Sequence, residues 1–76
     1  MTDVYVGYAI DEYGEGVPIA AGEDHDTVFN ATVQRNLLIM NLHGQISVQT
    51  RDISPEDAAT LEALVVTNLK EKGLLL

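Results

Sequence analysis

Near the start of the chain, larger apolar side chains at Val4, Val6, Tyr8 and Ile10 alternate with Tyr5, Gly7 and Ala9. Successive side chains of a β-strand point to opposite faces, so this alternation predicts a first strand. Residues 11–16 include two glycines, which favour turns, and lead into a short apolar run at 17–21. We therefore expect a β-hairpin, and Pro18 places its second strand at a sheet edge because proline cannot donate a ladder hydrogen bond.

The segment after the hairpin has the apolar spacing of an α-helix. Asp24 and Asp26 are suitable N-cap residues, and apolar side chains then recur every three or four positions. The predicted helix has about four to five turns and ends at His43-Gly44, where glycine favours termination. Its apolar positions are Val28, Phe29, Thr32, Val33, Leu37, Leu38, Met40 and Leu42.

A third strand and a second helix are predicted in the rest of the chain. Residues 45–51 alternate again, with Ile46, Val48 and Thr50 on the face expected to meet the helices. Ser54-Pro55 followed by two acids is typical of a helix start, because serine caps and the helix dipole favours acids there. The apolar stripe of this second helix is Ala58, Leu61, Leu64, Val65 and Leu69, with Gly73 as its C′ residue.

These elements give the order β-β-α-β-α. The order predicts a small α+β domain whose helices lie on one face of a mainly antiparallel sheet. The 76 residues make a single domain, 1–76, and a chain of this length buries only about 60% of the surface that it exposes when unfolded. The chain also has no cysteine, so no disulfide adds stability. Burial against a second copy or a partner is therefore expected.

Charge is scarce along the first predicted helix, where Arg35 is the only Lys, Arg, Asp or Glu between Thr27 and Gly44. Depletion of charge is typical of an interface core, although coverage by the helix's own sheet and tail explains it equally well. Three terminal leucines are costly in water and should dock on the core, pair as a strand or enter a subunit interface. We predict a homo-oligomer with an interface formed by Asn30, Gln34, Asn41, Leu74, Leu75 and Leu76.

The net charge of −8 is concentrated in the N-terminal half, since the first 34 residues contain seven acids and no Lys or Arg. An acidic chain repels nucleic acid and anionic membranes but attracts a basic protein surface. The alternative is that the acids only keep a small domain soluble. The predicted partner-binding residues are Asp11, Glu12, Tyr13, Glu15, Glu23, Asp24 and Asp26.

Few residues are suited to catalysis. Ser47 and Ser54 are better explained as a strand position and a helix cap than as nucleophiles. Neither His25 nor His43 has a second histidine at ligand spacing, and His43 is expected to interact with the end of the first helix. Residues 23–26 carry potential metal ligands without the spacing of a calcium loop or a zinc site. We predict no enzymatic activity, no metal and no cofactor.

No basic segment followed by an apolar run begins the chain, and no stretch approaches the roughly 18 apolar residues that cross a bilayer. A cytoplasmic location is therefore expected, with no membrane partner.

The segment 4–36 contains the run VYVGYAI, an acidic hairpin and a Gly22-Glu23 step into a helix. With the size and acidity of the chain, it resembles small phage-encoded inhibitors, including anti-CRISPR proteins and phage inhibitors of host RNA polymerase. This resemblance implies a non-enzymatic inhibitor, acting as a DNA mimic in the host cytoplasm. Such an inhibitor occupies the basic nucleic-acid-binding surface of a defence or transcription protein.

The same segment is also similar to the HicB-like antitoxin domain, in which a hairpin leads into a Gly-acid-Thr helix start followed by Ala and Asn. Gly22, Thr27, Ala31 and Asn36 are the positions that match. This second resemblance implies a small antitoxin. A small oligomeric structural subunit, acidic only for solubility, is the other alternative.

Overall fold

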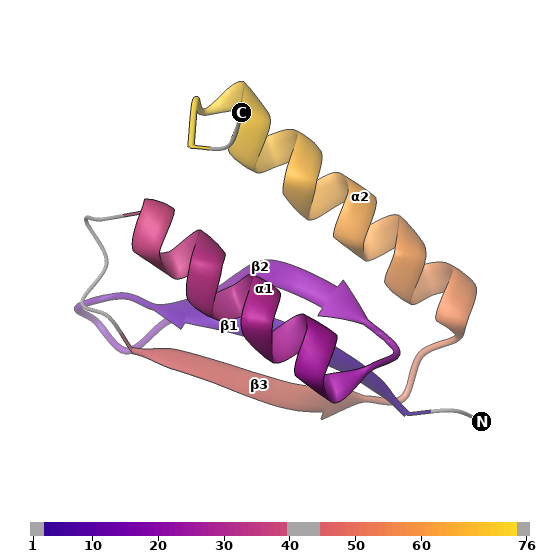
Figure 1. The fold of residues 1–76 in the computed structure, drawn as a ribbon. Helices are drawn as coiled ribbons and strands as arrows, with labels where there is room; N and C mark the ends of the chain where they lie inside the picture. Colours follow the sequence, from indigo (N-terminus) through magenta and orange to yellow (C-terminus); the bar gives the residue numbers. More distant parts are fainter. Residues whose placement is uncertain (1–2, 40–44, 75–76) are drawn as a thin grey trace.

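A three-stranded antiparallel sheet and two helices form the domain in the computed structural model, which describes residues 3–39 and 45–74 (Figure 1). The elements are β1 (Val4–Ile10), β2 (Gly16–Gly22), α1 (His25–Leu38), β3 (Ile46–Arg51) and α2 (Pro55–Glu71). The predicted order β-β-α-β-α and the α+β class are both confirmed.

The strands lie in the order β2-β1-β3, so β1 is central. Tyr5 in β1 pairs with Gly22 on one side and with Thr50 on the other. β2 is an edge strand, as Pro18 predicted. Gly7 pairs with Ala20 and Tyr8 pairs with Pro18, so Ile19 is an extra residue in β2 without a partner in β1. An extra residue of this kind is a β-bulge.

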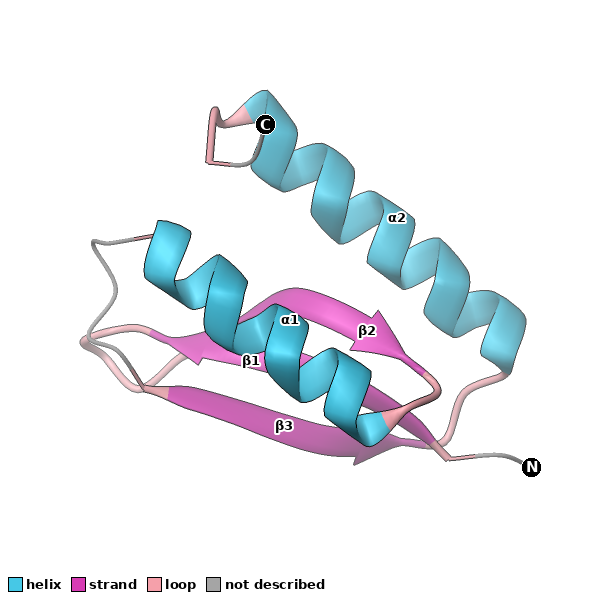
Figure 2. Cartoon of the chain, in the orientation of Figure 1, coloured by secondary structure: helices cyan, strands magenta, loops and turns pink. Residues whose placement is uncertain are grey.

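Helix α1 lies across the sheet and contacts all three strands, whereas α2 runs beside β2 (Figures 1 and 2). The approach of α1 to β1 is close because Gly7 has no side chain: a Cβ atom there would overlap Thr32. The hydroxyl of Thr32 donates to the carbonyl oxygen of Val28 at 2.6 Å, so its burial leaves no unsatisfied donor. Val28, Thr32 and Asn36 form the buried row of α1.

A hydrophobic cluster joins the sheet to α2. Its buried members are Ala9, Ile19, Val65 and Leu69, and Ile39, Leu61 and Leu74 pack against it. The two ends of α2 agree with the prediction, since Ser54 is the N-cap and Gly73 has a φ of +74°. The backbone N–H of Leu74 donates to the carbonyl of Leu69 at 2.9 Å, which turns the chain back onto the cluster.

Two predictions about apolar residues are wrong. Helix α1 ends at Leu38 and not at His43-Gly44, because the chain leaves helical geometry at Ile39, whose side chain packs against the cluster. The buried row of α1 is also narrower than predicted, since the close contact at Gly7 favours small and polar residues. Side chains predicted to be buried but exposed are Phe29, Leu37, Leu38 and Leu64. The predicted positions Met40, Leu42 and His43 lie outside the described residues.

Candidate protein-binding surface at the acidic end

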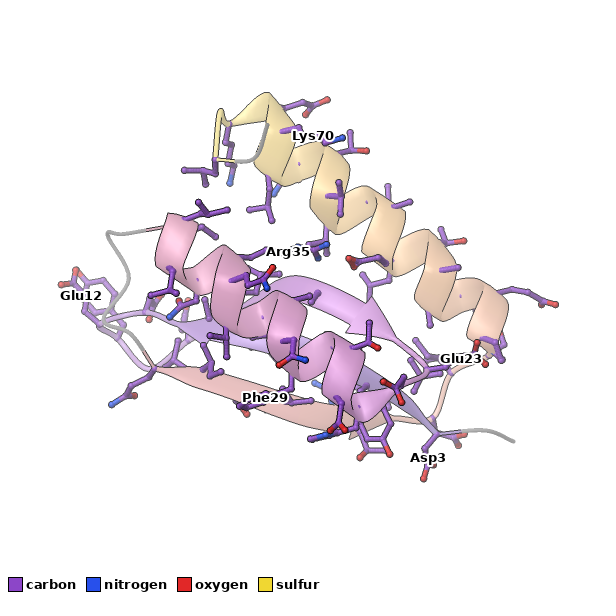
Figure 3. All side chains as sticks on the ribbon, viewed as in Figure 1. Asp3, Glu12, Glu23, Phe29, Arg35 and Lys70 are labelled. Atoms are coloured by element: carbon purple, nitrogen blue, oxygen red, sulfur yellow. The ribbon has the colours of Figure 1, made fainter. Side chains whose placement is uncertain are left out.

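Five segments of the chain meet at the end of the domain where β1 begins. Because the sheet is antiparallel, β2 and β3 both end there, and both helices start there (Figure 1). Asp3 and Glu23 lie at this end, which is the right-hand end in Figure 3. Every segment contributes acidic residues. We call the set of Asp3, Glu23, Asp24, Asp26, Asp52, Glu56 and Asp57 the acidic end.

Local capping explains several of these acids. The carboxylate of Asp24 is the N-cap of α1 and accepts hydrogen bonds from the Thr27 hydroxyl at 2.7 Å and from the Thr27 N–H at 2.9 Å. These two hydrogen bonds, the hydroxyl first, lower the pKa of Asp24 from its ordinary value of 3.8. Asp26 lies in the first turn of α1, and Glu56 and Asp57 in the first turn of α2, where the helix dipole favours negative charge.

The acidic end is exposed, and within residues 3–39 and 45–74 none of its carboxylates forms an ion pair with Lys or Arg. Asp26 Oδ1 lies 3.3 Å from Nδ1 of His25. Arg51 is nearby on β3, but its guanidinium donates to the Tyr8 hydroxyl from Nη2 at 2.6 Å and from Nε at 3.1 Å. It also lies 5.4 Å from the centre of the Tyr8 ring. In the described part of the chain, no Lys or Arg side chain therefore neutralises the carboxylates at this end.

His25 has a packing role at this end. Its ring meets the Tyr5 ring edge-to-face with 5.2 Å between centroids, and it stacks on Phe29 at 6.2 Å. Both are common aromatic packing geometries. The three rings connect β1 to the first turn of α1.

The residues predicted to bind a partner fall into two groups at opposite ends of β2. Glu12 and Glu23 are labelled at the two ends in Figure 3. Seven strand residues separate the groups, which corresponds to about 23 Å. In the hairpin, Oδ1 of Asp11 accepts the N–H groups of Tyr13 at 2.9 Å and Glu15 at 2.8 Å, so it shapes the turn. The structure therefore does not join the hairpin acids and those around Glu23 into one surface.

Four residues of the acidic end were missed by the sequence analysis: Asp3, Asp52, Glu56 and Asp57. Asp52, Glu56 and Asp57 belong to the stretch 35–76, where four basic residues nearly balance five acids. Only the pairing of Val4 with Arg51 brings that stretch beside the start of β1. The strand order could have revealed these residues, because in an antiparallel sheet the third strand ends beside the start of the first.

The structure describes three of the six residues of the predicted oligomer interface. Asn30 and Gln34 are exposed on α1, while Leu74 is half-buried against the domain's own cluster. Asn41, Leu75 and Leu76 lie outside the described residues. For Leu74, docking on the core is the alternative that the structure supports.

The hairpin turn borders a shallow hollow of about 360 Å³, lined by Asp11, Glu12, Gly14 and Gln45. In the described part of the chain, no group of three or more His, Cys, Asp or Glu side chains is placed to hold a metal ion. Among the same residues, no helix is long and apolar enough to cross a membrane. No family model, curated protein or solved structure matches this chain.

Proposed function

We propose that the domain is a non-enzymatic protein-interaction module whose acidic end binds a basic surface of another protein. The observation that carries this proposal is the convergence of exposed carboxylates from five segments without a Lys or Arg ion pair among the described residues. A partner with a surface rich in Arg or Lys supplies the missing counter-charges.

The electrostatics of the domain favour a partner that handles nucleic acid. Twelve acids against four Lys and Arg residues repel phosphate, so direct nucleic-acid binding is disfavoured. A protein surface that normally holds phosphates attracts the same carboxylates. This supports an inhibitor that occupies such a surface in place of nucleic acid, as phage-type inhibitors of defence or transcription proteins do, in the cytoplasm of the host.

Helix capping supports a second candidate function. Asp24 caps α1 and the first turn of α2 holds Glu56 and Asp57, so these acids have structural uses without any partner. In that case the acidity serves capping and solubility, and the domain is a HicB-like antitoxin or a small oligomeric subunit. Asp3, Glu23 and Asp52 lie outside the helices and discriminate between the two candidates.

Affinity purification from the native host, with the domain as bait, tests the proposal. The test variant carries Asp3→Asn, Glu23→Gln and Asp52→Asn, which remove three charges from the acidic end and spare the first turns of both helices. The matched control carries Glu12→Gln, Glu15→Gln and Glu71→Gln, which remove three charges elsewhere. We expect the wild type and the control to recover the same partner, and the test variant to recover much less of it.

Salt dependence of the recovered complex provides the second measurement. Charge-steered association weakens as ionic strength rises, and the test variant should show a shallower salt dependence than the control. Equal recovery by both variants, or an affinity that is flat between low and high salt, would contradict binding through the acidic end and favour the capping explanation.

A further inference from the structure

The outer edge of β2 is closed by two side chains from the helices. The N–H of Ala21 donates to Oε2 of Glu62 in α2 at 3.1 Å, and Nη1 of Arg35 in α1 donates to the carbonyl of Ile19 at 2.8 Å. Arg35 and Glu62 also form an ion pair with each other, and both side chains are largely buried. Together with the bulge beside Ile19, this arrangement protects the edge against pairing with another strand.

Among residues 3–39 and 45–74, no side chain or strand protects the outer edge of β3 in this way. The carbonyl of Gln45 accepts the N–H of Ile10 at 3.0 Å, so the odd-numbered residues of this segment direct their backbone groups toward β1. In an antiparallel ladder, the residues between them direct their N–H and C=O groups away from the paired strand. The N–H and C=O groups of Ile46, Val48 and Thr50 therefore face outward, and no hydrogen bond within the described residues uses them.

Apart from Arg51 at its last position, β3 lacks the usual sequence features that prevent edge pairing. Residues 46–50 contain no proline, glycine or charged residue, and the pairing of β3 with β1 is regular. Edge strands are usually protected by Lys, Pro, bulges or covering elements. The contrast between the two edges indicates that β3 is used for pairing.

An apolar row on α1, exposed at Phe29 and Leu37 and half-buried at Val33, lies on the same side of the domain. Phe29, Val33 and Leu37 follow one another at i, i+4 spacing, on the flank of the helix opposite Arg35. Figure 3 shows Arg35 on the side toward α2 and Phe29 on the side toward β3. Phe29 is 43% exposed and Leu37 63% exposed, which is costly for side chains of this size in water.

We propose that β3 pairs antiparallel with β3 of a second copy of this chain, forming a two-fold symmetric dimer with one continuous six-stranded sheet. In the dimer Val48 lies opposite its counterpart, and Ile46 lies opposite Thr50 of the other copy. This register pairs the outward-facing residues with one another and keeps all of them on the helix face of the sheet. It satisfies about six backbone hydrogen bonds, two for each of the three pairs.

The register also brings the apolar rows of the two α1 helices to face each other. Gly7 pairs with Val48 and lies beneath Thr32, so the two-fold axis at Val48 passes close to Val33. Phe29 of one copy then faces Leu37 of the other. The β1 strand of one copy lies three strand spacings, about 14 Å, from the β1 strand of the other. The two α1 helices above them are therefore far apart, and long side chains are needed to fill the space between them. Phe29 and Leu37 have the required length.

Charge distribution favours the antiparallel arrangement with an identical copy. Paired strands run in opposite directions, so the acidic ends of the two copies lie at opposite ends of the combined sheet. Arg35 is the only charged residue of α1 after its first turn, and it faces away from β3. The contact surface therefore avoids the repulsion expected between two chains with a net charge of −8 each.

Cysteine cross-linking tests the register, because the native chain has no cysteine. Val48→Cys places two thiols directly opposite each other, within about 5.5 Å between Cα atoms, which a disulfide can span. Gln49→Cys is the matched control, since residue 49 faces residue 47 of the other copy and not its own counterpart. Mild oxidation should convert the Val48→Cys protein to a covalent dimer at least several times faster than the control.

Sedimentation velocity tests the pairing itself. The wild-type protein should sediment as a dimer at micromolar concentration. Val48→Pro removes an outward N–H while leaving the β1–β3 ladder intact, and it should raise the dimer dissociation constant on the order of tenfold or more with an unchanged circular dichroism spectrum.

The proposal would be overturned if the wild-type protein is a monomer at micromolar concentration. It would also be overturned if β3 pairs only with a strand of a different protein. A folded Val48→Pro variant that dimerises as tightly as wild type places the interface elsewhere and overturns it too. If Val48→Pro fails to fold, the cross-linking rates decide: equal rates for the two cysteine variants reject the register.

Discussion

Thr32 of α1 lies directly over Gly7 of β1, and its side chain fills the space that a Cβ atom on Gly7 would occupy. Gly7→Ala forces the helix and the strand apart, and overpacking of this kind costs about 1–3 kcal/mol of unfolding free energy. Chemical denaturation of the two proteins measures the difference. Gly22→Ala is the matched control, because its Cβ meets only the Cγ2 atom of Val28, at 3.2 Å, and a smaller loss is expected.

Shortening Thr32 should partly rescue the Gly7→Ala variant. Thr32→Ala removes the hydroxyl and the methyl group but keeps its Cβ, which would lie 2.9 Å from the new Cβ at position 7. The double variant should therefore be more stable than additivity predicts, yet less stable than wild type. Strict additivity would show that the two residues are not in contact.

Glu62 should contribute more to stability than other acids of α2. Glu62→Ala leaves the Ala21 N–H without its acceptor and Arg35 without its partner in a largely buried site. We expect a loss of about 1–3 kcal/mol, measured by urea denaturation. Glu71→Ala, in the exposed last turn of the same helix, should change stability by less than about 0.5 kcal/mol. Equal losses would mean that the edge of β2 does not depend on Glu62.

The N-cap of α1 should make part of the stability pH-dependent. The hydrogen bonds from Thr27 lower the pKa of Asp24 in the folded state, so the stability that the ionised cap contributes is complete above its unfolded pKa of about 4. That contribution is lost as the pH falls through the lowered folded pKa. Asp24→Ser keeps a capping oxygen that does not titrate. Between about pH 5 and about pH 2 the wild type should therefore lose more stability than the variant.

A buried amide oxygen in α1 offers a stabilising substitution. In the described part of the chain, Oδ1 of Asn36 is buried without a hydrogen-bond partner, which is an unfavourable state for a polar atom. Asn36→Leu removes the orphan acceptor and should raise the unfolding free energy by about 1 kcal/mol. Thermal denaturation followed by circular dichroism measures this. A clear drop in melting temperature would show that the amide makes contacts that leucine cannot replace.

Local signals account for most of the fold that could be predicted. Alternation defined β1 and β3, Pro18 marked an edge strand, and Ser54 and Gly73 bounded α2. Each of these signals depends on near neighbours in the sequence. The end of α1 was mispredicted because Ile39 packs against a hydrophobic cluster built from residues distant in the chain, and this packing overrides a downstream glycine.

The candidate site was only partly predictable for a similar reason. The abundance of acids near Glu23 was visible in the sequence, but Asp52 and Glu56 join them only through strand pairing. The same pairing geometry separates Glu12 from Glu23, although both belong to the same acidic stretch of the chain. Counting charges along the sequence therefore identified acidic residues but not the surface that they form in the folded domain.

The Arg35–Glu62 closure of β2 limits how large an assembly can grow. A sheet with two open edges can add copies at both sides and propagate into a filament. In the proposed dimer β3 is already paired, and on β2 the contacts at Ile19 and Ala21 leave that part of the edge closed to a further copy. If β3 pairs with a second copy as proposed, Arg35 and Glu62 therefore favour an assembly that stops at two molecules, although neither residue lies at the proposed contact.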